Sequence, residues 1–233
     1  MRFKAVFFDA GETLVHPAPS FPELFARITR EAGHDRAPAD VVEASRAVMT
    51  RFSEAARDGD LWTTSPERSR RFWLGVYEHM LRRLDLPSTD GLRDALYEGF
   101  TDLGNYALFD DVPAVLDELI DGGLRPGIVS NYEAWLEDLL ATLGVRDRFP
   151  VRVISGLEGV EKPDPRIYDL ALERSGLAAT EAAFVGDNSE FDVYPPAALG
   201  MFAVLIDRRG RHPDHVGARI TDLHDLLAVL EAA

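Results

Sequence analysis

Four residues with reactive or charged side chains are associated with short apolar runs of the sequence. Asp9 follows the first run, and Ser130 ends the second. Lys162 comes after the third run through a loop, and Asp187 follows the fourth. A carboxylate can act as a nucleophile or metal ligand, and a hydroxyl and an amine can hold an anion. Taken singly, Asp9 could be a turn residue and Ser130 a helix N-cap.

The apolar runs have the pattern of buried strands. Phe3–Phe8, apolar apart from Lys4, is closed by a turn, and strand-like runs alternate with helical periodicities after Gly104. The predicted strands are Phe3–Phe8, Arg125–Ser130, Val151–Ser155, Ala182–Gly186 and Phe202–Ile206. The predicted helices are Val112–Asp121, Glu133–Leu143, Arg166–Ser175, Val193–Leu199 and Leu223–Glu231. This alternation predicts an α/β fold with a doubly wound, Rossmann-like parallel sheet, whose strands present the four side chains at one edge.

The segment between the first and second strands is helical in pattern. Four helices are predicted there: Phe21–Ala32, Ala39–Arg57, Pro66–Leu84 and Asp90–Leu103. Ser65 and Pro66 form a start signal, with serine as N-cap and proline at the first helical position. We therefore expect an α/β core domain of residues 1–15 and 107–233, with residues 16–106 inserted as an α-helical domain.

The composition excludes several classes of protein. The chain has 40 Asp and Glu against 25 Lys and Arg, a net charge of -15, which disfavours binding to nucleic acid or anionic membranes. Because there is no cysteine, disulfides and thiolate chemistry are excluded. The first apolar run is too short for a signal peptide or a membrane span, so a cytoplasmic protein is expected. A monomer and a homodimer both stay open.

Four motifs in this order resemble the haloacid dehalogenase superfamily, in the group that carries a helical cap after the first motif. The motifs are Phe7-Phe8-Asp9-Ala10-Gly11-Glu12-Thr13-Leu14, Ile128-Val129-Ser130-Asn131, Lys162-Pro163-Asp164-Pro165, and Val185-Gly186-Asp187-Asn188 with Asp192. Each motif alone is a weak match. The ordered set spans nearly the whole predicted core and is specific.

The resemblance implies a catalytic role for each matching side chain. Asp9 would attack phosphorus and form an aspartyl-phosphate that water hydrolyses, while Thr13 would hydrogen-bond and orient it. Ser130 and the backbone amide of Asn131 would hold a phosphoryl oxygen, and Lys162 would neutralise charge. The implied activity is a phosphatase acting on a small phosphorylated molecule.

The resemblance also implies Mg²⁺ as a cofactor. Its ligands would be Asp9, the backbone carbonyl of Gly11, and Asp187, an oxygen set that suits a hard cation. Asp192 and Asn188 would lie outside the ligands, with Asp192 ordering Lys162 or a metal-bound water.

One position departs from the pattern. Typical phosphatases of the family carry a second aspartate two residues after the nucleophile as general acid and base, and this chain has Gly11 there. Such a group is commonly worth about 10²- to 10⁴-fold in rate, so slow turnover or selectivity for good leaving groups is expected. Glu12 or His16 could replace it, a hypothesis based only on their closeness to Asp9 in the sequence.

Three alternatives follow from Gly11. Halide-releasing relatives also lack the second aspartate, but they need no metal and resemble a serine- and asparagine-rich fourth motif. Phosphonate cleavage would need a cap lysine, and the only lysines are Lys4 and Lys162. The third alternative is a non-catalytic binding or regulatory protein, which the retained set of motif residues disfavours.

The predicted helical cap would close over the site and contact the leaving group. Among its aromatic residues, Trp62 is the one we select as a substrate contact, because it precedes a helix start and is expected in a loop.

Overall fold

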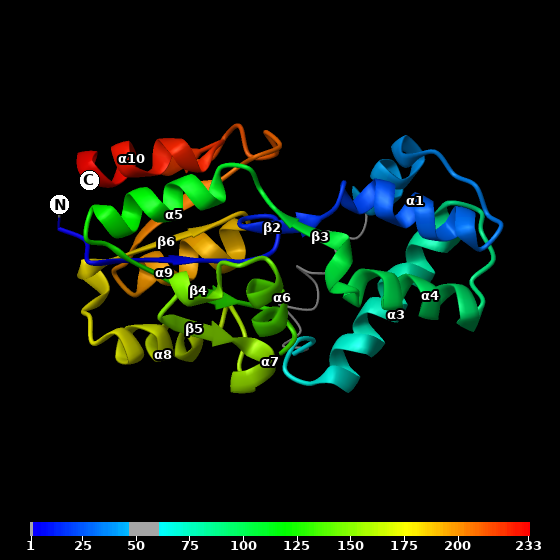
Figure 1. Ribbon diagram of the computed structural model, residues 1–233, viewed down its shortest axis with the longest axis horizontal. Coiled ribbons are helices and arrows are strands. Elements are labelled where there is room, and N and C mark those ends of the chain that lie inside the picture. Colours follow the sequence, from blue (N-terminus) through cyan, green and yellow to red (C-terminus); the bar gives the residue numbers. More distant parts are fainter. Residues whose placement is uncertain (1, 47–60) are drawn as a thin grey trace. The chain divides into compact units, whose positions relative to one another are not determined.

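The computed structural model describes residues 2–46 and 61–233. Two compact units are formed, Met1–Val15 with Leu108–Ala233 and, separately, His16–Ala107. The first is an α/β unit and the second is helical (Figure 1). No helix among the described residues combines the length and apolar composition that a bilayer span requires.

The α/β unit is built on a six-stranded parallel sheet with the order β5-β4-β1-β6-β7-β8. The strands are β1 (Ala5–Phe8), β4 (Arg125–Ser130), β5 (Val151–Ile154), β6 (Ala182–Gly186), β7 (Phe202–Ile206) and β8 (Ala218–Ile220). The chain builds the sheet outward from β1 to β5 and then returns to add β6 on the other side of β1. The strand order therefore reverses at β1, the point where open parallel sheets bind ligands.

Helices cover both faces of this sheet. Figure 1 shows α5 (Val112–Asp121) and α10 (Leu226–Ala232) on one side and α8 (Pro165–Ser175) on the other. Shorter helices complete the unit: α6 (Leu136–Thr142), α7 (Ser155–Glu158) and α9 (Tyr194–Ala198). The apolar core beneath α8 includes Phe7, Val129, Val153, Ile167, Tyr168 and Phe184. Because helices cover both faces of the sheet, the sequences of β1 and β6 are continuously apolar rather than alternating between apolar and polar residues.

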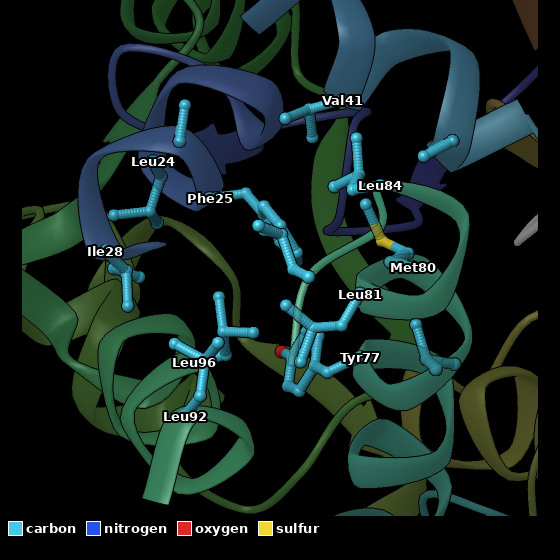
Figure 2. Packing of buried hydrophobic residues seen from close by; sticks show 14 of the residues in the cluster. Leu24, Phe25, Ile28, Val41, Tyr77, Met80, Leu81, Leu84, Leu92 and Leu96 are labelled. Carbon is cyan, nitrogen blue, oxygen red and sulfur yellow. The ribbon is translucent and has the colours of Figure 1, made fainter. Parts of the chain in front are cut away.

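The helical unit has its own core. Its helices are α1 (Phe21–Glu31), residues 38–46, α3 (Pro66–Arg83) and α4 (Asp90–Thr101). Ser20, Ser65 and Thr89 cap α1, α3 and α4, because each hydroxyl accepts a hydrogen bond from a first-turn amide. Figure 2 shows leucines and aromatic rings of these helices meeting in a single cluster, which includes Leu24, Phe25, Tyr77, Met80, Leu81 and Leu96.

A two-stranded sheet lies where the chain passes between the units. It pairs β2 (Val15–Pro17) with β3 (Tyr106–Leu108).

The observed architecture confirms the predicted parallel α/β fold. Predicted strand and helix positions agree with the structure to within a few residues, but β2, β3 and β8 were not predicted, since three residues carry no readable alternation. The predicted helix Ala39–Arg57 is observed over 38–46, and its remainder falls outside the described residues.

Candidate active site

The carboxyl ends of the three central strands bring the candidate residues together. Phe8 pairs in register with Ile128 of β4 and Val185 of β6. The next residue, Asp9, is anchored because its backbone N–H donates to the carbonyl of Val185 over 2.9 Å. Ser130 ends β4 and Asp187 follows β6, so both lie beside Asp9 at the same rim.

One oxygen of Asp9 accepts two hydrogen bonds. Ser130 Oγ donates to Asp9 Oδ1 over 2.9 Å, and Lys162 Nζ donates to the same oxygen over 2.7 Å. All three side chains are buried, and Asp9 keeps 8% of its surface exposed. Among the described residues no hydrogen bond reaches Asp9 Oδ2. The carboxylate is therefore fixed through one oxygen and retains the other for chemistry.

Lys162 is held through its backbone as well as its ammonium group. The side chain of Asn131 accepts from Lys162 N over 2.6 Å and donates to the Lys162 carbonyl over 2.8 Å. Burial alone would lower the pKa of Lys162, but the carboxylates of Asp192 and Asp9 outweigh it and raise that pKa. These two carboxylates therefore favour the charged ammonium form of Lys162.

Asp192 supplies the second carboxylate on Lys162, with 2.6 Å between Nζ and Oδ1. It sits in a π-helical turn, Ser189–Val193, and its other oxygen accepts from the Asn188 backbone N–H over 3.0 Å. Only glycine fits at position 186, because a Cβ there would lie 2.3 Å from Asp192 Cγ. Burial raises the pKa of Asp192, the charge of Asp9 adds to this, and Lys162 opposes it.

Asp187 differs from Asp9 and Asp192, because its carboxylate does not bind Lys162 or any other described residue. One carboxylate oxygen from each of Asp9, Asp187 and Asp192 lies within 4.8 Å of the others. Among the described residues, no hydrogen bond or ion pair reaches the Asp187 carboxylate. Burial raises its pKa well above the ordinary value, and the charges of Asp9 and Asp192 raise it further. Ionisation of all three carboxylates would place more negative charge here than Lys162 neutralises.

Two of the predicted site side chains have surroundings that differ from the expectation, and their roles stay predictions. The Thr13 hydroxyl makes no hydrogen bond to Asp9 and has no partner among the described residues. Trp62 lies in a loop, as predicted, but it is 4% exposed and stacks on Phe72 with 5.1 Å between ring centroids.

The two residues considered as replacements for the missing acid have other contacts. Glu12 forms an ion pair with Arg209, and its backbone has a φ of 57°. His16 belongs to the helical unit, and its Nδ1 lies 2.8 Å from the Pro17 carbonyl oxygen. The hydrogen bonds to the Asp9 carboxylate come instead from Ser130 and Lys162.

Two neighbours of the site were not anticipated. Tyr132 lies beside Gly11, and Arg208 binds the backbone of Thr13. Tyr132 directly follows Ser130-Asn131 in the sequence and could have been found from that position. Arg208 carried no such signal, since it belongs to no motif.

Comparison with known proteins identifies the class of protein that this fold represents. A family model described as haloacid dehalogenase-like hydrolase matches residues 3–200. The protein is therefore a hydrolase, and it belongs to the haloacid dehalogenase-like family.

Individual relatives agree with this assignment. Haloacid dehalogenase-like hydrolase domain-containing protein 3 of Danio rerio is 30% identical over 219 residues, which cover 91% of this chain and 88% of the relative. Phosphoserine phosphatase of Thermus thermophilus is 27% identical over 96% of this chain and 97% of its own length. The structure of the putative HAD-hydrolase YfnB of Bacillus subtilis has the same fold, with a TM-score of 0.78, 14% identity and 99% of both chains covered.

Proposed function

We propose that this hydrolase is a Mg²⁺-dependent phosphatase that attacks a small phosphomonoester with Asp9. The observation that carries the proposal is the setting of Asp9: a buried carboxylate held through one oxygen by Ser130 and Lys162, with the other oxygen unbonded to described residues. The curated relatives named phosphoserine phosphatase and glyceraldehyde 3-phosphate phosphatase support phosphate as the reacting group.

The residues present fit a divalent cation. Asp187 is a carboxylate with a raised pKa and no partner among the described residues, within 4.8 Å of two further carboxylates. Both oxygens of Asp192 are already bonded, to Lys162 and Asn188, so Asp9 and Asp187 are the better ligands, with the Gly11 carbonyl as the third. When bound, Mg²⁺ would screen repulsion between these carboxylates and the substrate and stabilise charge during transfer.

The reaction has two displacements at phosphorus. Asp9 attacks the phosphoryl group, the ester P–O bond breaks, and the alcohol oxygen departs with the bonding electron pair. Water then attacks the aspartyl-phosphate, which releases inorganic phosphate and restores Asp9. Lys162 offsets negative charge throughout. Because Gly11 has no side chain, the departing oxygen takes its proton from solvent, which favours leaving groups that are stable as anions.

The helical unit, residues 16–107, is proposed to act as the cap that contacts the leaving group. Its separate core and its insertion between β1 and β4 support this role.

Hydrolysis of p-nitrophenyl phosphate with Mg²⁺ or with a chelator tests the proposal, with 2-chloropropionate as the competing substrate and Asp9→Asn as the control. We expect phosphate release that requires Mg²⁺ and is lost in Asp9→Asn. Chloride release in the presence of chelator would overturn it in favour of a dehalogenase. Turnover of neither substrate, with metal binding intact, would favour a binding protein.

A further inference from the structure

Arg208, which lies two residues beyond β7, makes a two-pronged ion pair inside the α/β unit. Its Nη1 and Nη2 donate to the two oxygens of Asp111 over 2.7 and 2.9 Å. Only 12% of the arginine side chain and 4% of the aspartate side chain are exposed. Paired planar groups of this kind fix both position and orientation.

The same guanidinium binds the backbone of the first motif. Nη2 and Nε of Arg208 donate to the Thr13 carbonyl over 2.9 and 3.3 Å. Its Cζ also lies 3.9 Å from the ring centroid of Phe109, and the Phe109 backbone N–H donates to the Leu14 carbonyl over 3.0 Å. Arg208 therefore touches the chain on both sides of the inserted helical unit, after β1 and after β3.

Asp111 connects Arg208 to a further segment of the chain. One of its oxygens also accepts from the Leu223 backbone N–H over 2.8 Å. Burial would raise the pKa of Asp111, but the hydrogen bonds from Arg208 and Leu223 outweigh it and hold that pKa below the ordinary value. The carboxylate thus stays charged and keeps Arg208 in place.

The segment that Arg208 binds is a tight turn directly after Asp9. The Ala10 carbonyl accepts from Leu14 N over 2.8 Å and from Val15 N over 3.0 Å. Within this turn Glu12 has a positive φ of 57°, a conformation that a non-glycine residue adopts only when its surroundings impose it. Since the Thr13 hydroxyl has no partner among the described residues, the turn is held through its main chain rather than by that side chain.

We propose that Arg208 is a positioning residue for the reaction at Asp9. By binding the Thr13 carbonyl and Asp111 together, it fixes the turn 10–15 and with it the direction of the Asp9 carboxylate and the Gly11 carbonyl. The neighbouring Arg209, paired with Glu12, supports the same turn from its exposed side. This inference rests on the proposed function, which needs Asp9 as nucleophile.

The test compares Arg208→Lys with Arg219→Lys. Lysine keeps the charge but cannot make the paired bonds to Asp111 and Thr13. Arg219 is a matched control, because it donates to Asp207 through Nε and Nη2 over 3.1 and 2.8 Å in the same unit. Among the described residues, none of its hydrogen bonds involves the turn 10–15. We expect kcat for p-nitrophenyl phosphate, per folded molecule, to fall about 10- to 100-fold in Arg208→Lys with KM nearly unchanged, since small misplacements cost that much. Arg219→Lys should keep the wild-type kcat.

Amide hydrogen exchange gives a readout that does not depend on turnover. The Leu14 and Val15 amides should exchange faster in Arg208→Lys than in the wild type and in Arg219→Lys. Wild-type exchange and wild-type kcat per folded molecule in Arg208→Lys would overturn the proposal, even if the melting temperature fell. Failure of the proposed function can be distinguished from failure of this inference. If the proposed function fails, the wild-type protein lacks phosphatase activity, but the exchange comparison still tests whether Arg208 fixes the turn.

Discussion

The ring of Tyr132 lies beside Gly11, with its Cε2 3.7 Å from the position that a Cβ on Gly11 would take. This is an ordinary van der Waals distance, and Gly11 is not among the glycines with positive φ. The backbone at position 11 therefore accepts a side chain without a steric clash at Cβ. The edge-on packing of Trp135 against Tyr132, with 4.8 Å between centroids, helps to define this side of the site.

Gly11→Asp should restore the missing general acid. We expect kcat/KM for an alkyl phosphate, a poor leaving group, to rise about 10²-fold, with a smaller gain for p-nitrophenyl phosphate, whose leaving group needs no proton. Gly11→Asn is the matched control, since it has the same shape without the acid. Equal rates for the two variants on the alkyl phosphate would show that no proton donor is missing at this position.

Lys162→Met should damage both stability and activity. Removing the ammonium group leaves Asp9 and Asp192 buried next to each other without a counter-charge, and breaking such a pair commonly costs about 3–5 kcal/mol. We expect that loss in the free energy of unfolding by urea, together with loss of phosphatase activity.

The protein has only one other lysine, which serves as control for this substitution. Lys4 pairs with Glu181 at the surface, where its side chain is 60% exposed, so Lys4→Met should change stability by about 0–1 kcal/mol. Equal effects of the two substitutions would contradict the role assigned to the buried pair.

Mg²⁺ should stabilise the wild-type protein but not Asp187→Asn. Binding at 100 times Kd adds about 2.7 kcal/mol to the free energy of unfolding. In a chelator, Asp187→Asn should be at least as stable as wild type, because one of three crowded carboxylates is neutralised. Thermal unfolding with and without Mg²⁺ measures both effects, and Asp169→Asn, at an exposed helix position, is the control. A melting temperature that Mg²⁺ raises equally in all three proteins would argue against Asp187 as a ligand.

The pH dependence of stability should report on Asp111. Its folded pKa lies below the ordinary 3.8, so its contribution is complete above the unfolded pKa and is lost as the pH falls through the folded value. Asp111→Asn should therefore destabilise the protein strongly at pH 7, and the difference from wild type should shrink as the pH falls below about 4. Urea unfolding at a series of pH values checks this, and a constant difference across the series would contradict it.

Much of the architecture could be predicted because buried parallel strands leave a direct signal. The apolar runs located β1, β4 and β6, and the rule that ligands lie at their carboxyl ends grouped Asp9, Ser130 and Asp187. The contact of Lys162 with Asp192, expected from the family resemblance, is a buried ion pair of 2.6 Å.

The features that were missed depend on tertiary packing. Thr13 was expected to bond Asp9, but hydroxyl direction follows from the local turn and its neighbours rather than from sequence spacing. Trp62 was predicted to be a substrate contact in a loop, and its stacking on Phe72, with 5.1 Å between ring centroids, cannot be inferred from periodicity alone. Arg208 binds the backbone carbonyl of Thr13 and the side chain of Asp111, and both residues are far from it in the sequence. No local sequence pattern therefore identifies Arg208.

The central place of β1 in the sheet also bears on how the protein folds. Ala5 pairs with Arg125 on one side and with Ala182 on the other, so the strand that presents Asp9 has no partner near it in the chain. Contacts of such long sequence separation form late, because loop closure must precede them. Because β4 precedes β6 in the chain, the sheet on both sides of β1 is complete only after β6 has been made. The Asp9 carboxylate is held by Ser130 and Lys162, which lie 121 and 153 residues away in the chain, so its surroundings are among the last to be assembled.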